Sequence, residues 1–300
     1  MTLTETGTAD PYPTRMSGDP ELLDRDEPTV WESGMAGPID PATLAAHDSR
    51  GYSTHPDLLS APEVAAFQHE LDRLPSTLDD DPRMITEDGE VRTIFEVHRI
   101  SPLIGELASD PRVLDRARQI LGSDVYVHQS RATYLPAFEG RGNFWHSDFE
   151  TWHAEDGMPV PRAVSMSIAL TDHHPFNGGL MMMPGSHRTF VPCAGATPPE
   201  HCRTPLGGGD TGTEIGVPSP SHVTSLARAY GIDPYTAPAG TAVMFDANLM
   251  HGSGNNITPF PRSTIFLVFN SVENPLLRPY GGTAPRPRHM ACREAVPLRR

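Results

Sequence analysis

Alternating apolar and polar residues in four separate stretches constrain the fold of this chain more than any other feature. The clearest is AVSMSIALT at 163–171, where one face carries Val164, Met166, Ile168 and Leu170 and the other carries Ser165, Ser167 and Ala169. A period of two is typical of a β-strand with one buried face. The same strand-like alternation occurs in residues 124–134, 240–246 and 262–270, with turn-rich segments between them. Within 124–134, the face with Val125 and Val127 is expected to carry Gln129, Arg131 and Thr133.

Helical patterns precede most of these strands. Residues 60–74 begin with a capping box, Ser60 with Glu63, and repeat apolar residues on one face: Val64, Phe67, Leu71 and Leu74. Residues 110–122 begin with Asp110 and Pro111 and end at Gly122. A third short helix is expected near 223–230.

This order of elements predicts the fold class. Helices followed by many short strands favour a mainly β fold with flanking helices, a jelly-roll or barrel-like core. No linker-like break interrupts residues 50–290. We therefore expect a single domain at 41–300, preceded by a polar and partly ordered segment at 1–40.

The composition excludes several functions. The formal net charge is −15, whereas proteins that bind nucleic acid carry a basic stripe. All 23 basic residues are arginines, so the chain lacks the lysine of Schiff-base chemistry and of phosphate-binding loops. No apolar run approaches the roughly 20 residues of a membrane-spanning helix, and the first ten residues do not resemble a secretory signal. We expect a cytoplasmic protein with neither nucleic-acid nor membrane partners.

The three cysteines, Cys193, Cys202 and Cys292, form no CxxC pair. An odd number without such spacing does not indicate a disulfide framework or a zinc site. They are interpreted as reduced thiols.

The segment GNFWHSDFETWHAEDG at 142–157 contains a candidate metal site. Side chains two positions apart point the same way on a strand, so we interpret the segment as a strand that presents His146 and Asp148 to one point. His251 is the best third ligand, completing the 2-His-1-carboxylate set of non-haem Fe(II) oxygenases, which leaves positions open for cosubstrate and O2. His153, an odd step from His146, and His187, in a tight turn, are weaker candidates.

Residues near these ligands have the chemistry to bind organic molecules. Arg262 follows His251 by eleven positions, and its guanidinium could hold a carboxylate of a dicarboxylic cosubstrate through two hydrogen bonds. Gln129, on a strand face with Arg131, is a candidate to orient a substrate. Aromatic faces suit a small cationic or zwitterionic substrate, although they are equally typical of a β-core; those near the ligands in sequence are Phe149, Trp152, Phe245 and Phe266.

The motifs resemble those of one family. FWHSDFETWHAEDGMP at 144–159 resembles the signature of the ectoine hydroxylases, within the phytanoyl-CoA dioxygenase superfamily. Other segments match in family order: DPYPTR (10–15), FEVHRIS (95–101), QILGSDVYVHQSR (119–131), LMMMPGSH (180–187), HGSGNNITPFPR (251–262) and NSVENPL (270–276). The resemblance spans about residues 10–292 and is far more specific than the superfamily pattern.

The resemblance implies a function and a set of site residues. The fold would be a double-stranded β-helix, and the reaction would convert ectoine to 5-hydroxyectoine with 2-oxoglutarate and O2, releasing succinate and CO2, in compatible-solute biosynthesis. By this resemblance His146, Asp148 and His251 hold Fe(II), and Arg262 with Ser253 binds the distal carboxylate of 2-oxoglutarate. Positions that match substrate contacts are Gln129, Thr151, Trp152, Phe245 and Phe266. A homodimer is implied as well, and Arg286 is a further candidate for the site.

One position departs from the family. Residues 134–138 read YLPAF where members usually read YKPGF, so Leu135 replaces a lysine near 2-oxoglutarate, and Arg131 or Arg141 would have to compensate. Three alternatives remain open: a related dioxygenase with another amino-acid-like substrate, a zinc hydrolase with the same three ligands, and a non-catalytic solute-binding β-barrel. Ectoine-stimulated decarboxylation would argue against the first, and a comparison of activity with Fe(II) and Zn(II) would decide the second. Any turnover would exclude the third.

Overall fold

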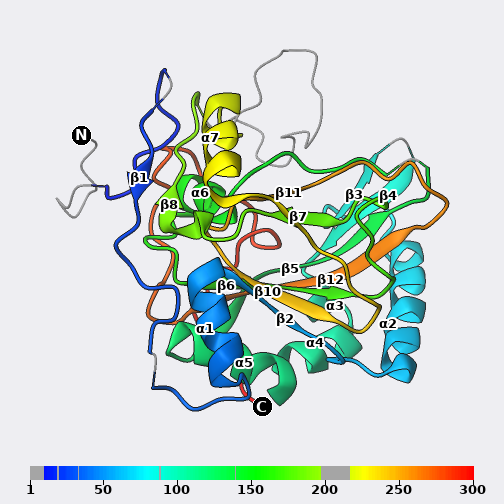
Figure 1. Cartoon of the computed structure of the whole chain (residues 1–300). Helices are drawn as coiled ribbons and strands as arrows, with labels where there is room; N and C mark the ends of the chain where they lie inside the picture. Colours follow the sequence, from blue (N-terminus) through cyan, green and yellow to red (C-terminus); the bar gives the residue numbers. More distant parts are fainter. Residues whose placement is uncertain (1–9, 19, 33, 88, 139, 197–216) are drawn as a thin grey trace.

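Two antiparallel sheets form the centre of the molecule (Figure 1). The computed structural model describes residues 10–300 except 19, 33, 88, 139 and 197–216. The large sheet has the order β2-β10-β6-β12-β5-β4-β3, from Tyr52–His55 (β2), Met84–Glu87 (β3), Glu90–Phe95 (β4), Val125–Leu135 (β5), Ala163–Ala169 (β6), Ala242–Asp246 (β10) and Arg262–Ser271 (β12). The small sheet, β11-β7-β9, lies across from it and consists of Leu180–Met182 (β7), Asp233–Pro234 (β9) and His251–Ser253 (β11). Leu23–Asp24 (β1) pairs with Thr189–Phe190 (β8).

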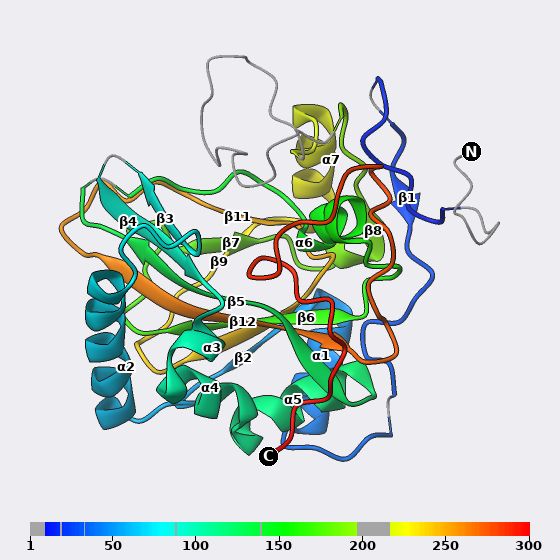
Figure 2. The same cartoon turned by 180° about the vertical axis from the view of Figure 1, so that it is seen from behind.

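Helices cover the outer face of the large sheet (Figure 2). They are Pro41–Arg50 (α1), Ala61–Arg73 (α2), Val97–Ile100 (α3), Pro102–Ser109 (α4) and Pro111–Leu121 (α5). Near the small sheet lie Asp148–Thr151 (α6), the π-helix Trp152–Asp156 (η2) and Pro220–Tyr230 (α7). The predicted helices at 60–74 and 110–122 are confirmed, and the third begins three residues before its expected start.

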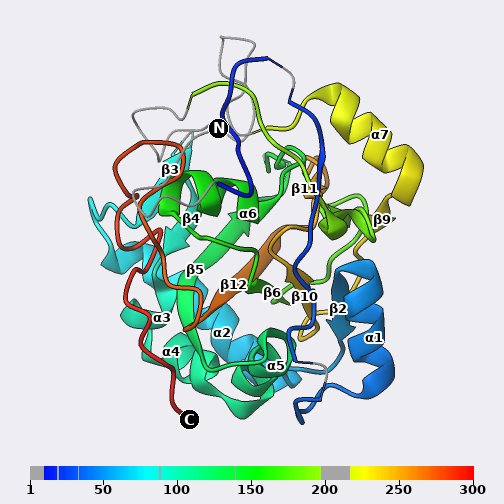
Figure 3. The same ribbon diagram turned by 90° about the vertical axis from the view of Figure 1, so that its left-hand side faces the viewer.

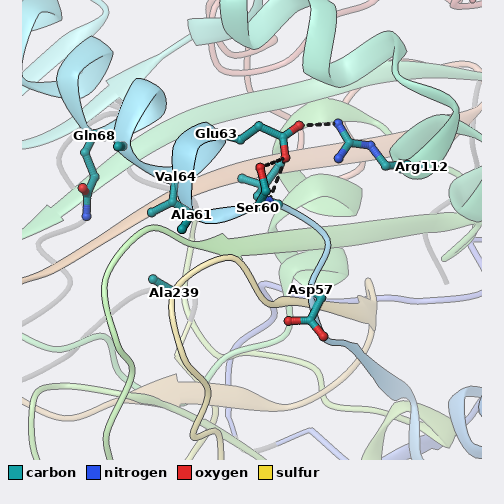
Figure 4. A pocket seen from close by; sticks show the side chains of 10 residues that line it. Asp57, Ser60, Ala61, Glu63, Val64, Gln68, Arg112 and Ala239 are labelled. Carbon is teal, nitrogen blue, oxygen red and sulfur yellow. Dashed lines mark hydrogen bonds and ion pairs between the residues drawn. The ribbon is translucent and has the colours of Figure 1, made fainter.

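The capping box at the start of α2 also joins this helix to α5 (Figure 4). The backbone N and the Oγ of Ser60 both donate to Glu63 Oε2 at 2.7 Å. Arg112 Nη2 donates to the other oxygen of Glu63 at 2.7 Å, and its Nη1 donates to the carbonyl of Leu58 at 3.0 Å. A cap predicted from local sequence therefore also holds two helices together against the sheet.

Apolar residues fill two layers, one on each side of the large sheet. The outer layer, under the helices, contains the predicted face of β6: Val164, Met166, Ile168 and Leu170. The same layer contains the predicted apolar face of residues 60–74, including Leu71 in α2 and Leu74 directly after it. Ser165 and Ser167 point to the opposite side, into the space between the sheets. The alternation in 163–171 thus predicted both faces of this strand correctly.

The predicted face of β5 is wrong, because the strand contains a β-bulge. Val125 and Val127 belong to the outer core, whereas Gln129 and Arg131 face the space between the sheets. In the pairing with β12, Val268 lies opposite Gln129 but Phe269 lies opposite Val127, so His128 is an extra residue. One inserted residue reverses the alternation of every side chain beyond it.

Segments near both ends of the described chain pack close to α6 and η2, whereas the chain itself ends against α5, where Arg300 pairs with Asp115 (Figure 3). In the N-terminal segment, Tyr12 is 3% exposed and Arg25 Nη1 donates to Asp246 Oδ1 at 2.7 Å. Near the C-terminus, the backbone N of Cys292 donates to the carbonyl of His128 at 2.8 Å. The division of the chain into 1–40 and 41–300 stays a prediction, and residues 1–9 lie outside the described residues.

Two further expectations concern thiols and membranes. Cys193 and Cys292 are free and buried, and Cys202 lies outside the described residues. Among the helices that the structure describes, none has both the length and the apolar character needed to cross a membrane.

Candidate active site

The three predicted metal ligands meet between the two sheets. The ligand atoms of His146, Asp148 and His251 all lie within 4.8 Å of one another, and no other such group occurs among the described residues. His146 Nε2 is 3.7 Å and His251 Nε2 is 4.0 Å from Asp148 Oδ1. The backbones of His146 and His251 exchange two hydrogen bonds of 2.9 Å, so pairing across the small sheet sets the distance between the two imidazoles.

The segment 142–157 is not the strand that we predicted. Its extended part ends at Ser147, and α6 starts at Asp148 because Ser147 Oγ accepts a hydrogen bond from the backbone N of Glu150 at 3.2 Å. His146 and Asp148 still point to one place, since only the extended residue Ser147 separates them. The Ser-x-x-Glu pattern from Ser147 to Glu150 is the sequence signal for this helix start.

Hydrogen bonds orient each ligand toward a common point. His146 Nδ1 donates to the carbonyl of Phe144 at 2.7 Å, and His251 Nδ1 donates to that of Leu249 at 3.0 Å, which leaves both Nε2 lone pairs available to a metal. Burial lowers the pKa of His251 to about 4, so its imidazole is neutral at pH 7. Although burial opposes ionisation of Asp148, the nearby imidazoles and Arg131 hold the pKa of this carboxyl below its usual value. Neutral imidazoles with an ionised carboxylate are the forms that bind a divalent metal.

Ser165 orients the carboxylate ligand. Its Oγ donates to Asp148 Oδ2 at 3.1 Å, so Oδ1 is the oxygen that faces the two imidazoles. We expect Ser165→Ala to weaken Fe(II) binding roughly 10- to 100-fold, the usual cost of losing a hydrogen-bond partner of a metal ligand. Competition with a fluorescent chelator under anaerobic conditions measures this affinity. Ser167→Ala, on the same strand face, is the matched control, and equal affinities in both variants would contradict the role of Ser165.

A cavity of about 570 Å³ opens beside the triad, and Arg262 lies in its wall. Burial lowers the pKa of Arg262 to about 10, and no ion pair joins it to an acid within the described part of the chain. Among the residues that the structure describes, none forms a hydrogen bond with the Nε of Arg262. A buried cation without an acid partner is costly unless an anion binds to it. The site therefore fits a carboxylate ligand, as predicted.

Arg131 is a second buried cation in the cavity. Its guanidinium lies 4.3 Å from the centre of the Phe266 ring, and its Nη1 is 3.5 Å from Gln129 Oε1. Burial lowers its pKa, while the charge of Asp148 acts in the opposite direction. Gln129 Nε2 donates to the carbonyl of Met290 at 2.7 Å, so the predicted polar group is fixed by the C-terminal segment.

Ser253 and Leu135 line the same cavity as Arg262. Leu135 pairs with Arg262 across the β5–β12 ladder. Gly140 and Gly178 make room for the leucine side chain, because a Cβ on either would collide with it. Arg141, proposed to compensate for the missing lysine, donates to Glu87 at 2.8 Å and is half exposed.

The predicted substrate contacts divide into two groups. Thr151, Trp152 and Phe266 line the cavity, and Trp152 is 2% exposed. Phe245 is not brought to the cavity: its ring packs behind His251 at 4.9 Å and against Phe266 at 5.7 Å.

The weaker ligand candidates have other partners. The ring of His153 is bonded to Asp10 and to the carbonyl of Met158, and it stacks on Tyr280 with centres 3.9 Å apart. It lies in η2, so the strand-face argument against it was wrong although the conclusion holds. His187 is in a short 3-10 helix, Ser186–Arg188, and contacts the carbonyl of Asp48.

Sequence reasoning largely missed an ionic group at the cavity wall. Arg286 donates to both oxygens of Asp156, at 2.7 and 2.6 Å, and its Nε is 3.7 Å from Glu155. Arg15 binds Glu150 from the N-terminal side. Only Arg286 was a candidate beforehand. The run of acids at 150–156 inside an aromatic segment was the available signal.

A double-stranded β-helix with a facial His-Asp-His triad defines the class of non-haem Fe(II) dioxygenases. The family model of phytanoyl-CoA dioxygenase matches residues 47–264. An ectoine dioxygenase of Nocardia farcinica is 54% identical over 293 residues, which cover 96% of this chain and 95% of that protein. The crystal structure of EctD from S. alaskensis with 2-oxoglutarate and 5-hydroxyectoine has a TM-score of 0.84 at 44% identity, covering 97% of this chain and 98% of that one. The same enzyme with bound Fe gives a TM-score of 0.83 at 42% identity, with the same coverage.

These matches span nearly the whole chain at identities well above the level at which only a fold is shared. The chain belongs to the phytanoyl-CoA dioxygenase family. The predicted fold class and the predicted kind of enzyme, an Fe(II)- and 2-oxoglutarate-dependent dioxygenase, are confirmed.

Proposed function

We propose that this enzyme hydroxylates ectoine to 5-hydroxyectoine, with 2-oxoglutarate and O2 as cosubstrates and succinate and CO2 as co-products. The observation that carries this is the triad beside two buried arginines in one cavity, in a chain about half identical to an ectoine dioxygenase. Ectoine is a small zwitterion, and the cavity offers such a molecule arginines, a carboxylate and aromatic faces.

The chain's own residues divide the work. His146, Asp148 and His251 would hold the iron, which supplies the activation of O2 when it is bound. Arg262 and Ser253 bind the distal carboxylate of 2-oxoglutarate, and Arg131 stabilises negative charge nearer to Asp148. Gln129, Thr151, Trp152 and Phe266 position the substrate and exclude water. These roles rest on position and chemistry.

A coupled assay tests the function. The protein is loaded anaerobically with Fe(II), and succinate release from 2-oxoglutarate is measured in O2 with and without ectoine, with the product mass recorded. We expect ectoine to stimulate succinate release and to gain one oxygen atom. Slow succinate release at the same rate with and without ectoine would support the iron chemistry but contradict ectoine as the substrate.

Two further parts of the proposal concern assembly and location. We infer a homodimer from the resemblance alone, and light scattering of the purified protein tests it. The acidic composition and the need to keep iron reduced support a cytoplasmic enzyme.

A further inference from the structure

The N-terminal segment 10–15 packs directly on α6 and η2, the elements that carry Asp148 and Trp152. His153 Nε2 is 2.9 Å from Asp10 Oδ1, and the edge of the Tyr12 ring contacts Phe149 with centres 5.1 Å apart. Thr14 Oγ1 donates to Glu150 Oε1 at 2.5 Å. We call residues 10–15 the N-terminal strap.

Arg15 ends this strap inside the cavity wall. Its side chain is only 3% exposed. Its Nε and Nη2 donate to the two oxygens of Glu150 at 2.7 and 3.0 Å, and Nη2 also lies 3.4 Å from Glu155 Oε1. A two-point bond to Glu150 fixes both side chains in one orientation. Arg15 and Glu155 both line the cavity beside Trp152.

Glu155 is placed between two guanidinium groups that each have another carboxylate partner. Arg15 is bonded to Glu150, and Arg286 to Asp156, while Glu155 lies 3.4 Å from the first arginine and 3.7 Å from the second. Burial, together with the nearby carboxylates of Asp156 and Glu150, raises the pKa of Glu155, and the charges of Arg286 and Arg15 oppose that rise. Without Arg15, Glu155 would lose one of the cations that favour its ionised form.

We propose that Arg15 is a positioning residue for the substrate: it fixes the η2 wall that carries Trp152 and holds the Glu155 carboxylate ready for the cationic part of a zwitterion. This inference rests on the proposed function. Arg15 acts through Glu155 and is not assigned any contact with the reacting atoms. An ionised carboxylate beside an indole face is a suitable environment for a delocalised cation.

The test compares Arg15→Gln and Arg15→Lys with Arg25→Gln. Arg25 belongs to the same N-terminal region, is equally buried and pairs with Asp246, but it does not line the cavity. Ectoine affinity is measured by anaerobic calorimetry with Fe(II) and 2-oxoglutarate present, together with KM values and thermal stability. We expect Arg15→Gln to weaken ectoine binding about tenfold or more, with KM for 2-oxoglutarate unchanged. Arg15→Lys should restore part of the ectoine affinity. Arg25→Gln should lower thermal stability without changing ectoine affinity or KM for 2-oxoglutarate.

The pH dependence gives a readout that simple loosening of the fold would not produce. With one cation removed, Glu155 needs a higher pH to ionise, so ectoine affinity in Arg15→Gln should recover as pH rises. If Arg15→Gln bound ectoine as tightly as the wild type, or if Arg25→Gln weakened ectoine binding equally, the role of Arg15 would be contradicted. The proposed function would be unaffected. A wild-type enzyme that neither binds nor oxidises ectoine would overturn the proposed function and this inference with it.

Discussion

His251→Ala is expected to abolish iron retention and ectoine-dependent succinate release, leaving only background turnover. The substitution removes one of three ligands, a larger loss than the roughly 10- to 100-fold cost of removing a partner of a ligand. The fold should survive, because the two bonds between residues 146 and 251 involve only backbone atoms. Iron content after desalting and the coupled assay measure the two effects.

A buried histidine elsewhere provides the control. His47 in α1 is fully buried, is bonded to Ser53 at 3.0 Å and does not line the cavity. His47→Gln should lower thermal stability but keep both iron and turnover. If His251→Ala kept stoichiometric iron and coupled turnover, the triad assignment would fail.

Arg262→Gln is expected to raise KM for 2-oxoglutarate by roughly 30-fold to several thousand-fold. This range corresponds to the 2–5 kcal/mol typical of truncating one partner of a buried charge pair. Burial lowers the pKa of Arg262 to about 10, well below its usual value. In the ligand-free protein, the buried charge of Arg262 is therefore unfavourable for the folded state. The ligand-free variant should therefore unfold at the same temperature as the wild type or higher, so a functional loss would come without a loss of stability.

A smaller oxo acid tests the contact between Arg262 and the distal carboxylate of 2-oxoglutarate separately from the rest of cosubstrate binding. 2-Oxobutyrate keeps the keto-acid end of 2-oxoglutarate but lacks the distal carboxylate. Wild type and Arg262→Gln should bind this analogue equally, and their difference should appear only with 2-oxoglutarate. A variant that lost both ligands in equal measure would place Arg262 outside the distal-carboxylate site.

The metal triad and the position of Arg262 in the same cavity could be predicted because residue type and order along the chain carry the information. Few residue types bind Fe(II), and HxD followed by a distant His and an Arg restricts the choice to His146, Asp148, His251 and Arg262. The faces of β6 were also predictable, since local periodicity alone decides them. Strands with a uniform alternation and helices with capping residues can be predicted from their local sequence alone.

Other features depend on contacts that local patterns do not contain. The bulge at His128 inverts β5 without any Gly or Pro to mark it. Arg15 meets Glu150 across 135 positions, and Arg286 meets Asp156 across 130. Only tertiary packing brings such pairs together, which is why this ionic part of the cavity wall was largely unexpected. The start of α6 is different, because its Ser-x-x-Glu signal was present but outweighed by the strand interpretation.

Residues from both terminal segments, Arg15 and Arg286, line the cavity, and this has a consequence for biosynthesis. On the ribosome, residues 10–15 emerge long before the sheets exist to receive them, whereas residues 286–292 emerge after nearly every strand has been made. The sheets can pair first, but Gln129 and Asp156 gain their C-terminal partners only in the last step. Because His251 is made before Arg286, chain synthesis allows the three iron ligands to meet before the last residues of the cavity wall are in place.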